Sequence, residues 1–154
     1  VPDLQLVIVG EGPLRPVLEA HIAGHHAHDW IHLAGRLSHE ELIALYQRAW
    51  LVSSASLAEG WGLTLTEAAA CGTPCVATDV NGHRSSVVHG STGVLVPLEE
   101  LGDAMADVLL DAPRRAAMAA AALARARTLT WEASATGVLR GLHGQVMARA
   151  RRDG

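Results

Sequence analysis

A glycine-rich segment with a glutamate at each end, Glu59 to Glu67, carries the residue types most suited to chemistry in this sequence. Gly60 and Gly62 have no side chain, so the backbone N–H groups around them can approach a ligand closely. A helical pattern begins at Leu63, and a helix N-terminus carries about half a positive charge, which favours phosphate. The two carboxylates can accept hydrogen bonds from sugar hydroxyls. The segment therefore predicts a site for a phosphate-bearing ligand with hydroxyl groups, and such a site needs no lysine.

The same residues also have structural interpretations. Thr64 and Glu67 have the spacing of a capping box, so Glu67 could tie down the start of a helix. Glu59 alone would usually be a solvated loop carboxylate, but the glycines beside it favour a ligand role. Trp61 is interpreted as a core aromatic beneath the loop, with a platform for a sugar ring as the alternative.

Two further glycine turns follow predicted strands. Gly10 and Gly12 imitate a dinucleotide-binding fingerprint, but Arg15 stands where the third glycine should be. In the other turn, Gly82-His83-Arg84, Arg84 either approaches a phosphate or forms a charge pair on a short helix. The carboxyl ends of parallel strands are where ligands collect, so all three glycine turns are candidate parts of one site.

A group of histidines invites a metal-site interpretation. Two of them share one helical face, but a single aspartate is the only other ligand type at a suitable spacing. We therefore predict a solvated surface cluster and no metal. The cluster consists of His21, His25, His26, His28 and Asp29.

Five short apolar runs predict the strands of a parallel sheet. Each run is continuously apolar, as expected of strands that helices cover on both faces. From Leu98 onward the strands give way to helices, one of which has Thr130 as its N-cap. The sequence thus predicts a doubly wound, Rossmann-like α/β fold. The predicted strands are 4–9, 31–34, 51–55, 75–77 and 94–96, and the predicted helices begin near residues 14, 38, 63, 99, 113 and 131.

Composition excludes several classes of protein. The 154 residues fit one domain, and no apolar run approaches the ~18 residues that span a bilayer. Basic residues number 12, all arginine, against 16 acidic ones, so a nucleic-acid partner is not expected. Cys71 and Cys75 form neither a disulfide framework nor a zinc quartet, which indicates small core residues and a reducing compartment. The chain begins at Val1 without a signal peptide, so we expect a piece of a longer protein.

Several motifs, taken in order, resemble glycosyltransferase family 4, whose members are retaining enzymes of the GT-B fold. The segment from Glu59 to Glu67 matches the Glu-x7-Glu motif of that family, and the agreement covers nearly the whole chain. Its other parts are Val9-Gly10-Glu11-Gly12-Pro13, Ala68-Ala69-Ala70-Cys71-Gly72-Thr73-Pro74-Cys75-Val76-Ala77-Thr78, Gly82-His83-Arg84, Gly90-Ser91-Thr92-Gly93-Val94-Leu95-Val96-Pro97 and Trp131.

The resemblance implies a role for each candidate residue. Glu59 would contact the donor hexose as the catalytic glutamate, and Glu67 would bind the ribose hydroxyls. The backbone near Leu37 would meet the base, and the donor site would also include Gly10, Gly12 and Arg84. The amides that would hold the diphosphate belong to Gly60, Trp61, Gly62, Leu63 and Thr64.

The implied activity is transfer of a hexose from a GDP- or UDP-linked donor, with retention at the anomeric carbon and without a metal or other cofactor. The chain would be the C-terminal donor-binding domain, residues 1–154, with a helical part from 98 to 154. Its partners would be the nucleotide sugar, an unknown acceptor and the N-terminal acceptor lobe of the same enzyme, which lies outside this sequence. The enzyme would be cytoplasmic. The arginines Arg149, Arg151 and Arg152 are interpreted as a solvated tail, with peripheral membrane contact as the alternative.

The sequence also departs from the family pattern. Trp61 replaces the usual Phe, Ser85 stands where many relatives have an acidic residue, and the basic grip on the diphosphate is missing. The first strand–helix unit of the lobe is absent, so the strand at 6–9 should lack a neighbour and a gap should open beside the strand at 51–55. The alternatives are a non-catalytic nucleotide-binding module and, on Gly10 and Gly12 alone, a nicotinamide-dependent oxidoreductase.

Overall fold

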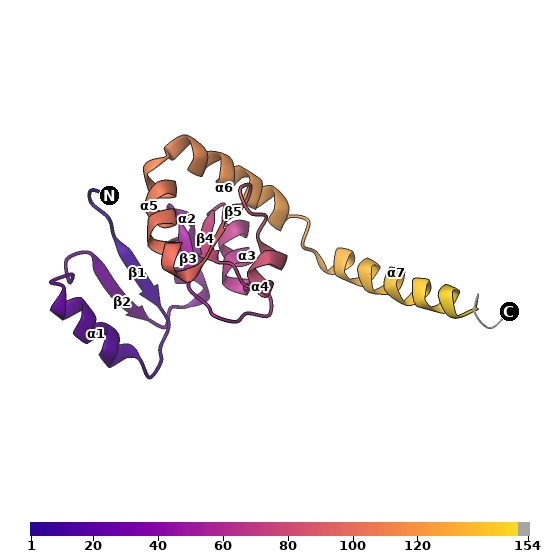
Figure 1. The fold of residues 1–154 in the computed structure, drawn as a ribbon, viewed down its shortest axis with the longest axis horizontal. Helices are drawn as coiled ribbons and strands as arrows, with labels where there is room; N and C mark the ends of the chain where they lie inside the picture. Colours follow the sequence, from indigo (N-terminus) through magenta and orange to yellow (C-terminus); the bar gives the residue numbers. More distant parts are fainter. Residues whose placement is uncertain (151–154) are drawn as a thin grey trace.

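The computed structural model describes residues 1–150, with the backbone alone at residues 146 and 150. Its five strands are all parallel, as the apolar runs predict, but they form two sheets instead of one (Figure 1). The first sheet pairs β1 (Leu6–Val9) with β2 (Ile31–Gly35). The second has the order β3 (Val52–Ser54), β4 (Cys75–Thr78), β5 (Gly93–Val96).

Helices follow the strands in the α/β order that the sequence predicts. The capping box at Ser38 is confirmed, because Ser38 and Glu41 each accept a hydrogen bond from the other's backbone N–H. Thr130 is likewise confirmed as a cap, since its hydroxyl oxygen accepts from the N–H of Ala133. The helices are α1 (Arg15–Gly24), α2 (His39–Arg48), α3 (Leu63–Ala70), α4 (Asn81–Ser86), the short 3-10 helix η1 (Leu98–Glu100), α5 (Leu101–Leu110), α6 (Ala112–Ala126) and α7 (Trp131–Ala150).

The core lies on both faces of β4, whose four residues are all buried. On one face, Cys75 and Ala77 pack with Leu65 of α3. On the other, Val76 packs with Val108 of α5 and Met118 of α6. Successive strand residues point to opposite faces, so this alternation shows that helices cover the second sheet on both sides. The fold is therefore a Rossmann-like, doubly wound α/β fold.

The two sheets are not joined by strand pairing. Within the described chain, β1 pairs only with β2 and β3 pairs only with β4, so each leaves one edge open. The residues of β1 are half-buried or exposed although all four are apolar. The break falls between the strands where the sequence analysis expects it.

The last helix, α7, projects away from the rest of the chain (Figure 1). Every residue of α7 whose side chain is described is exposed. None of the described helices is long and apolar enough to cross a bilayer. Residues 151–154, with the expected tail arginines Arg151 and Arg152, lie outside the described part.

Candidate functional site

The turn between β3 and α3 presents free backbone N–H groups. Gly62 is the N-cap of α3, with φ +79° and ψ 57°, a left-handed conformation that glycine adopts without strain. No side chain caps this helix. Within residues 1–150, the N–H groups of Gly62, Leu63 and Thr64 have no hydrogen-bond partner. The turn therefore offers three donors and the positive end of a helix to an anion.

Glu59 lies at the start of this turn and is exposed. Its carboxylate folds back onto its own loop: Oε2 accepts from the Ser56 hydroxyl at 3.4 Å, and Oε1 accepts from the Gly60 N–H at 3.1 Å. Both contacts are local and solvent-exposed, so a ligand hydroxyl can replace either of them.

Glu67 lies on α3 and is also exposed. The Tyr46 hydroxyl of α2 donates to its Oε2 at 3.5 Å. The capping interpretation of Glu67 is wrong, because the helix already begins at Leu63 and Thr64 is inside it. Burial raises the pKa of Tyr46 to about 12, and the nearby Glu67 carboxylate adds to the shift.

Trp61 is 37% exposed, so its interpretation as a core aromatic is wrong. Leu63 is exposed as well, at 67%. Both apolar side chains border the free N–H groups, and neither packs into the core clusters. An exposed indole beside the turn is available to a ligand.

Arg84 forms a charge pair on α4, as one of its two interpretations predicts. Its Nε and Nη2 donate to the two carboxylate oxygens of Asp79 at 2.6 and 2.8 Å. This pair lowers the pKa of Asp79. The pair is exposed, so its net contribution to stability is small. A phosphate contact of Arg84 stays a prediction, since it would have to compete with Asp79.

The sequence reasoning missed the residues beneath the turn. His83, considered only as a neighbour of Arg84, is completely buried, and it contacts Gly62. Gly82 lies directly under the backbone of Glu59 and Gly60. The available signal was the Gly82-His83 pair, which stands in a short helix after a buried strand. It did not reveal the contact, because the two segments lie about twenty residues apart.

The remaining candidates, Gly10, Gly12 and Leu37, lie at the carboxyl ends of the first sheet. The Gly10 N–H donates to the Gly35 carbonyl at 2.7 Å, which holds the two loops together. Leu37 follows Gly35 and is half-buried. Among the described residues, no hydrogen bond joins these loops to the turn at Gly62. The candidate residues thus form two groups, one on each sheet.

Histidines and cysteines form no metal site in the described part of the chain, where no group of three or more His, Cys, Asp or Glu could hold an ion. His21 and His25 instead stack, with ring centroids 6.2 Å apart. Cys75 is a core residue, as predicted, and burial raises its pKa to about 12. Cys71 is only half-buried.

Comparison with known sequences identifies relatives of this chain. The sequence profile of the family described as "Glycosyl transferases group 1" matches residues 1–125. The D-inositol 3-phosphate glycosyltransferase of Corynebacterium aurimucosum is 42% identical over 100 residues, which are 63% of this chain and 24% of that protein. The chain thus spans about a quarter of the length of that curated relative.

Solved structures of similar fold are also known. Sucrose-phosphate synthase from Thermosynechococcus elongatus is 30% identical and superposes with a TM-score of 0.80, over 97% of this chain and 40% of the synthase chain. The Anabaena protein HepE in complex with UDP-glucose is 27% identical, with a TM-score of 0.72, over 82% of this chain and 36% of its own.

Proposed function

The chain belongs to the glycosyl transferases of group 1, and on that premise we propose that it forms the nucleotide-sugar-binding lobe of a family 4 enzyme with the GT-B fold. The enzyme transfers a hexose from a nucleoside diphosphate to an acceptor and retains the anomeric configuration. The acceptor lobe belongs to the longer polypeptide, as does the missing first strand–helix unit. The whole enzyme is cytoplasmic, and any membrane contact is peripheral.

The turn at Gly62 carries this proposal. Its three N–H groups, which have no partner within residues 1–150, stand at the positive end of α3, and in the sequence they lie between two exposed carboxylates, Glu59 and Glu67. N–H donors fit phosphate oxygens, and carboxylates fit sugar hydroxyls. A nucleotide sugar has phosphates in its centre and hydroxyls on both sides, so its chemistry matches this order of groups.

Each group then has a role in the transfer. When the bond between the hexose and the β-phosphate breaks, negative charge develops on the departing diphosphate. The fixed N–H groups and the helix dipole stabilise that charge without reorganising, so they replace a metal ion. Glu67 holds the ribose hydroxyls, and Glu59 contacts the hexose whose anomeric carbon reacts.

The first sheet supplies the nucleoside end of the site. The backbone near Leu37 meets the base, and the glycine turn of Gly10 and Gly12 lies beside it. UDP is the favoured nucleotide of the sugar donor, because the Anabaena relative, which is 27% identical, was solved in complex with UDP-glucose. GDP is the alternative.

Thermal denaturation tests the proposal. We expect UDP to raise the melting temperature of the chain equally in a chelator and in Mg²⁺, because the backbone N–H groups bind the diphosphate directly; at 100 times Kd the gain is about 2.7 kcal/mol. The rise in melting temperature with GDP shows whether the chain distinguishes the two bases. The rise with NAD tests the alternative of an oxidoreductase. Stabilisation by NAD alone, or only in the presence of a divalent ion, would contradict the proposal.

A further inference from the structure

Among the side chains that the structure describes, His83 is the buried polar one whose bonding is incomplete. It lies on α4, is 0% exposed, and is among the largest fully buried side chains of the described chain. Its Nε2 atom is buried and has no hydrogen-bond partner within residues 1–150. Buried polar atoms are nearly always paired, so an exception calls for an explanation.

The other ring nitrogen of His83 determines which tautomer the neutral ring adopts. His83 Nδ1 lies 2.8 Å from the carbonyl oxygen of Thr78. A carbonyl can only accept, so Nδ1 carries the hydrogen, and in the neutral ring Nε2 has a lone pair. The Thr78 hydroxyl donates to the carbonyl of Ser56, at the start of the loop that leads to Glu59. His83 is therefore anchored to the same residue that anchors this loop.

The imidazole edge supports the turn that carries the free N–H groups. A Cβ atom placed on Gly62 would lie 2.9 Å from His83 Cδ2 and 3.6 Å from Nε2. A Cβ on Gly82 would lie 2.6 Å from the carbonyl carbon of Glu59. Both ends of the segment 59–62 thus rest on two consecutive residues of α4, and neither glycine has room for a side chain.

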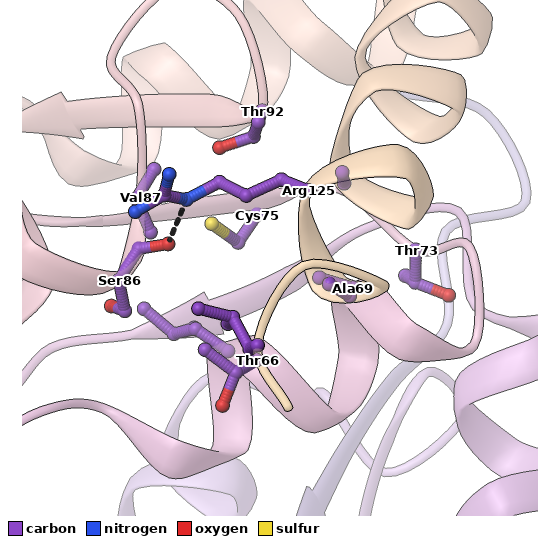
Figure 2. A pocket seen from close by; sticks show the side chains of 12 residues that line it. Thr66, Ala69, Thr73, Cys75, Ser86, Val87, Thr92 and Arg125 are labelled. Atoms are coloured by element: carbon purple, nitrogen blue, oxygen red, sulfur yellow. Dashed lines mark hydrogen bonds between the residues drawn. The ribbon is translucent and has the colours of Figure 1, made fainter. Parts of the chain in front are cut away.

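A residue from a distant helix holds α4 in place. Arg125 of α6 donates from Nε to the Ser86 carbonyl at 3.2 Å and from Nη2 to the Ser85 carbonyl at 3.0 Å. Figure 2 shows its side chain reaching across a small pocket to Ser86. A guanidinium at the last carbonyls of a helix satisfies acceptors that the helix itself cannot. Arg125 thereby fixes the helix that carries His83.

We propose that His83 is a positioning residue for the diphosphate end of the donor, an inference that rests on the proposed function. The imidazole acts through Gly62: it holds the turn so that the free N–H groups converge on the β-phosphate. Its Nε2, which has no partner within residues 1–150, lies at the same edge of the ring, beneath Gly62. His83 itself does not touch the reacting atoms.

Calorimetric titration of His83→Asn with UDP and with UMP tests this inference. The Asn side chain keeps an N–H for the Thr78 carbonyl and removes the ring edge under Gly62. We expect the Kd for UDP to rise about tenfold, which corresponds to about 1.4 kcal/mol. The Kd for UMP, which lacks the β-phosphate, should rise less than about threefold. His143→Asn on the exposed helix α7 is the matched control and should change neither constant.

The outcomes separate the inference from the function on which it rests. The positioning role is overturned if a folded His83→Asn variant binds UDP as well as the original chain does. It is also overturned if the variant loses the same affinity for UDP and for UMP. If the unaltered chain binds no nucleoside diphosphate, the proposed function fails and the inference falls with it. If His83→Asn does not fold, as circular dichroism would reveal, Arg125→Gln decides. Arg125→Gln should weaken the binding of UDP more than the binding of UMP. If the ratio of the two Kd values stays the same as in the original chain, the inference is overturned.

Discussion

Glu59 and Glu67 differ in what holds each carboxylate. Glu59 is bonded only to its own loop, through Ser56 and the Gly60 N–H. Glu67 sits on a helix and receives a hydrogen bond from Tyr46 of another helix. The Glu67 carboxylate is thus held by a contact between two helices, and the Glu59 carboxylate only by its own loop. The geometry thus supports separate roles for the two residues.

Separate roles predict separate effects of two matched substitutions. Glu67→Gln should weaken the binding of UDP itself, because the ribose hydroxyls lose a charged acceptor. Glu59→Gln should leave UDP binding unchanged and remove only the gain in affinity that an attached hexose brings. Each loss should be ~1.5–3 kcal/mol by calorimetry. Equal effects of both variants on UDP would contradict the division, and a change in stability alone at Glu67 would make that residue structural.

Two buried acids predict how stability depends on alkaline pH. Burial raises the pKa of Cys75 and of Tyr46 to about 12 in the folded chain, against ordinary values of about 8.5 and 10. The unfolded chain therefore releases these protons first as the pH rises. The stabilisation is complete below the unfolded values, and it is lost between about pH 9 and pH 12.

Urea denaturation at about pH 8 and about pH 11 measures this loss. The free energy of unfolding should fall as the pH rises, and Cys75→Ala should flatten the fall even if it lowers stability at both values. Tyr46→Phe should flatten it too, over the upper part of the range. A slope that both variants leave unchanged would show that other groups titrate.

At the scale of elements, local signals were sufficient for most of the fold. The capping box at Ser38 and the cap at Thr130 are set by neighbours three residues away, and both are confirmed. Apolar runs place all five strands within about two residues of their ends, as is usual for boundaries. Pairings between distant residues were not predictable. The contact of His83 with Gly62 and that of Tyr46 with Glu67 depend on how helices pack, and sequence periodicity does not report packing.

The helix α7 contributes little to the stability of the rest of the chain. Its apolar side chains include Trp131 at 89% and Leu139 at 66% exposure. Removing exposed surface forfeits almost no burial, so a chain of residues 1–129 should keep its melting temperature within about 2 °C. Its affinity for UDP should also stay the same, because the turn at Gly62 makes no hydrogen bond to described α7 residues.

Differential scanning calorimetry of the shortened chain checks this prediction. Gel filtration should also show less self-association, since the exposed apolar side chains of α7 are removed with it. A large fall in melting temperature would mean that α7 packs against the chain in solution. The 154-residue chain, which keeps α7, is the control in the same buffer.

At the scale of the whole molecule, the break between the sheets divides the candidate site. Gly10 and Leu37 belong to the first sheet, and the turn at Gly62 belongs to the second. Both β1 and β3 leave one edge without a strand partner in the described chain. Unpaired edges take up further strands readily. Strand pairing therefore does not fix the distance between the loops at Gly10 and Leu37 and the turn at Gly62.

This division predicts that the 154-residue chain alone transfers no sugar. The chain contains no lysine, and its candidate cation Arg84 is paired with Asp79, so a phosphate would have to displace Asp79 to gain a cationic side chain there. Transfer also requires the acceptor to be held against the donor, and proximity of this kind contributes ~7–11 kcal/mol to a two-substrate reaction. The match covers 24% of a curated relative, so that relative has room outside the matched part for groups that hold an acceptor.

Incubation of the purified chain with UDP-glucose and a panel of acceptors tests this last prediction. We expect UDP binding by calorimetry, at most slow release of glucose, and no glycosylated product by mass spectrometry. A longer polypeptide that adds the proposed acceptor lobe is the matched comparison, and transfer should appear there and disappear with Glu59→Gln. Product formed by the 154-residue chain as a monodisperse monomer would mean that one lobe holds both substrates, and the prediction of no transfer would be wrong.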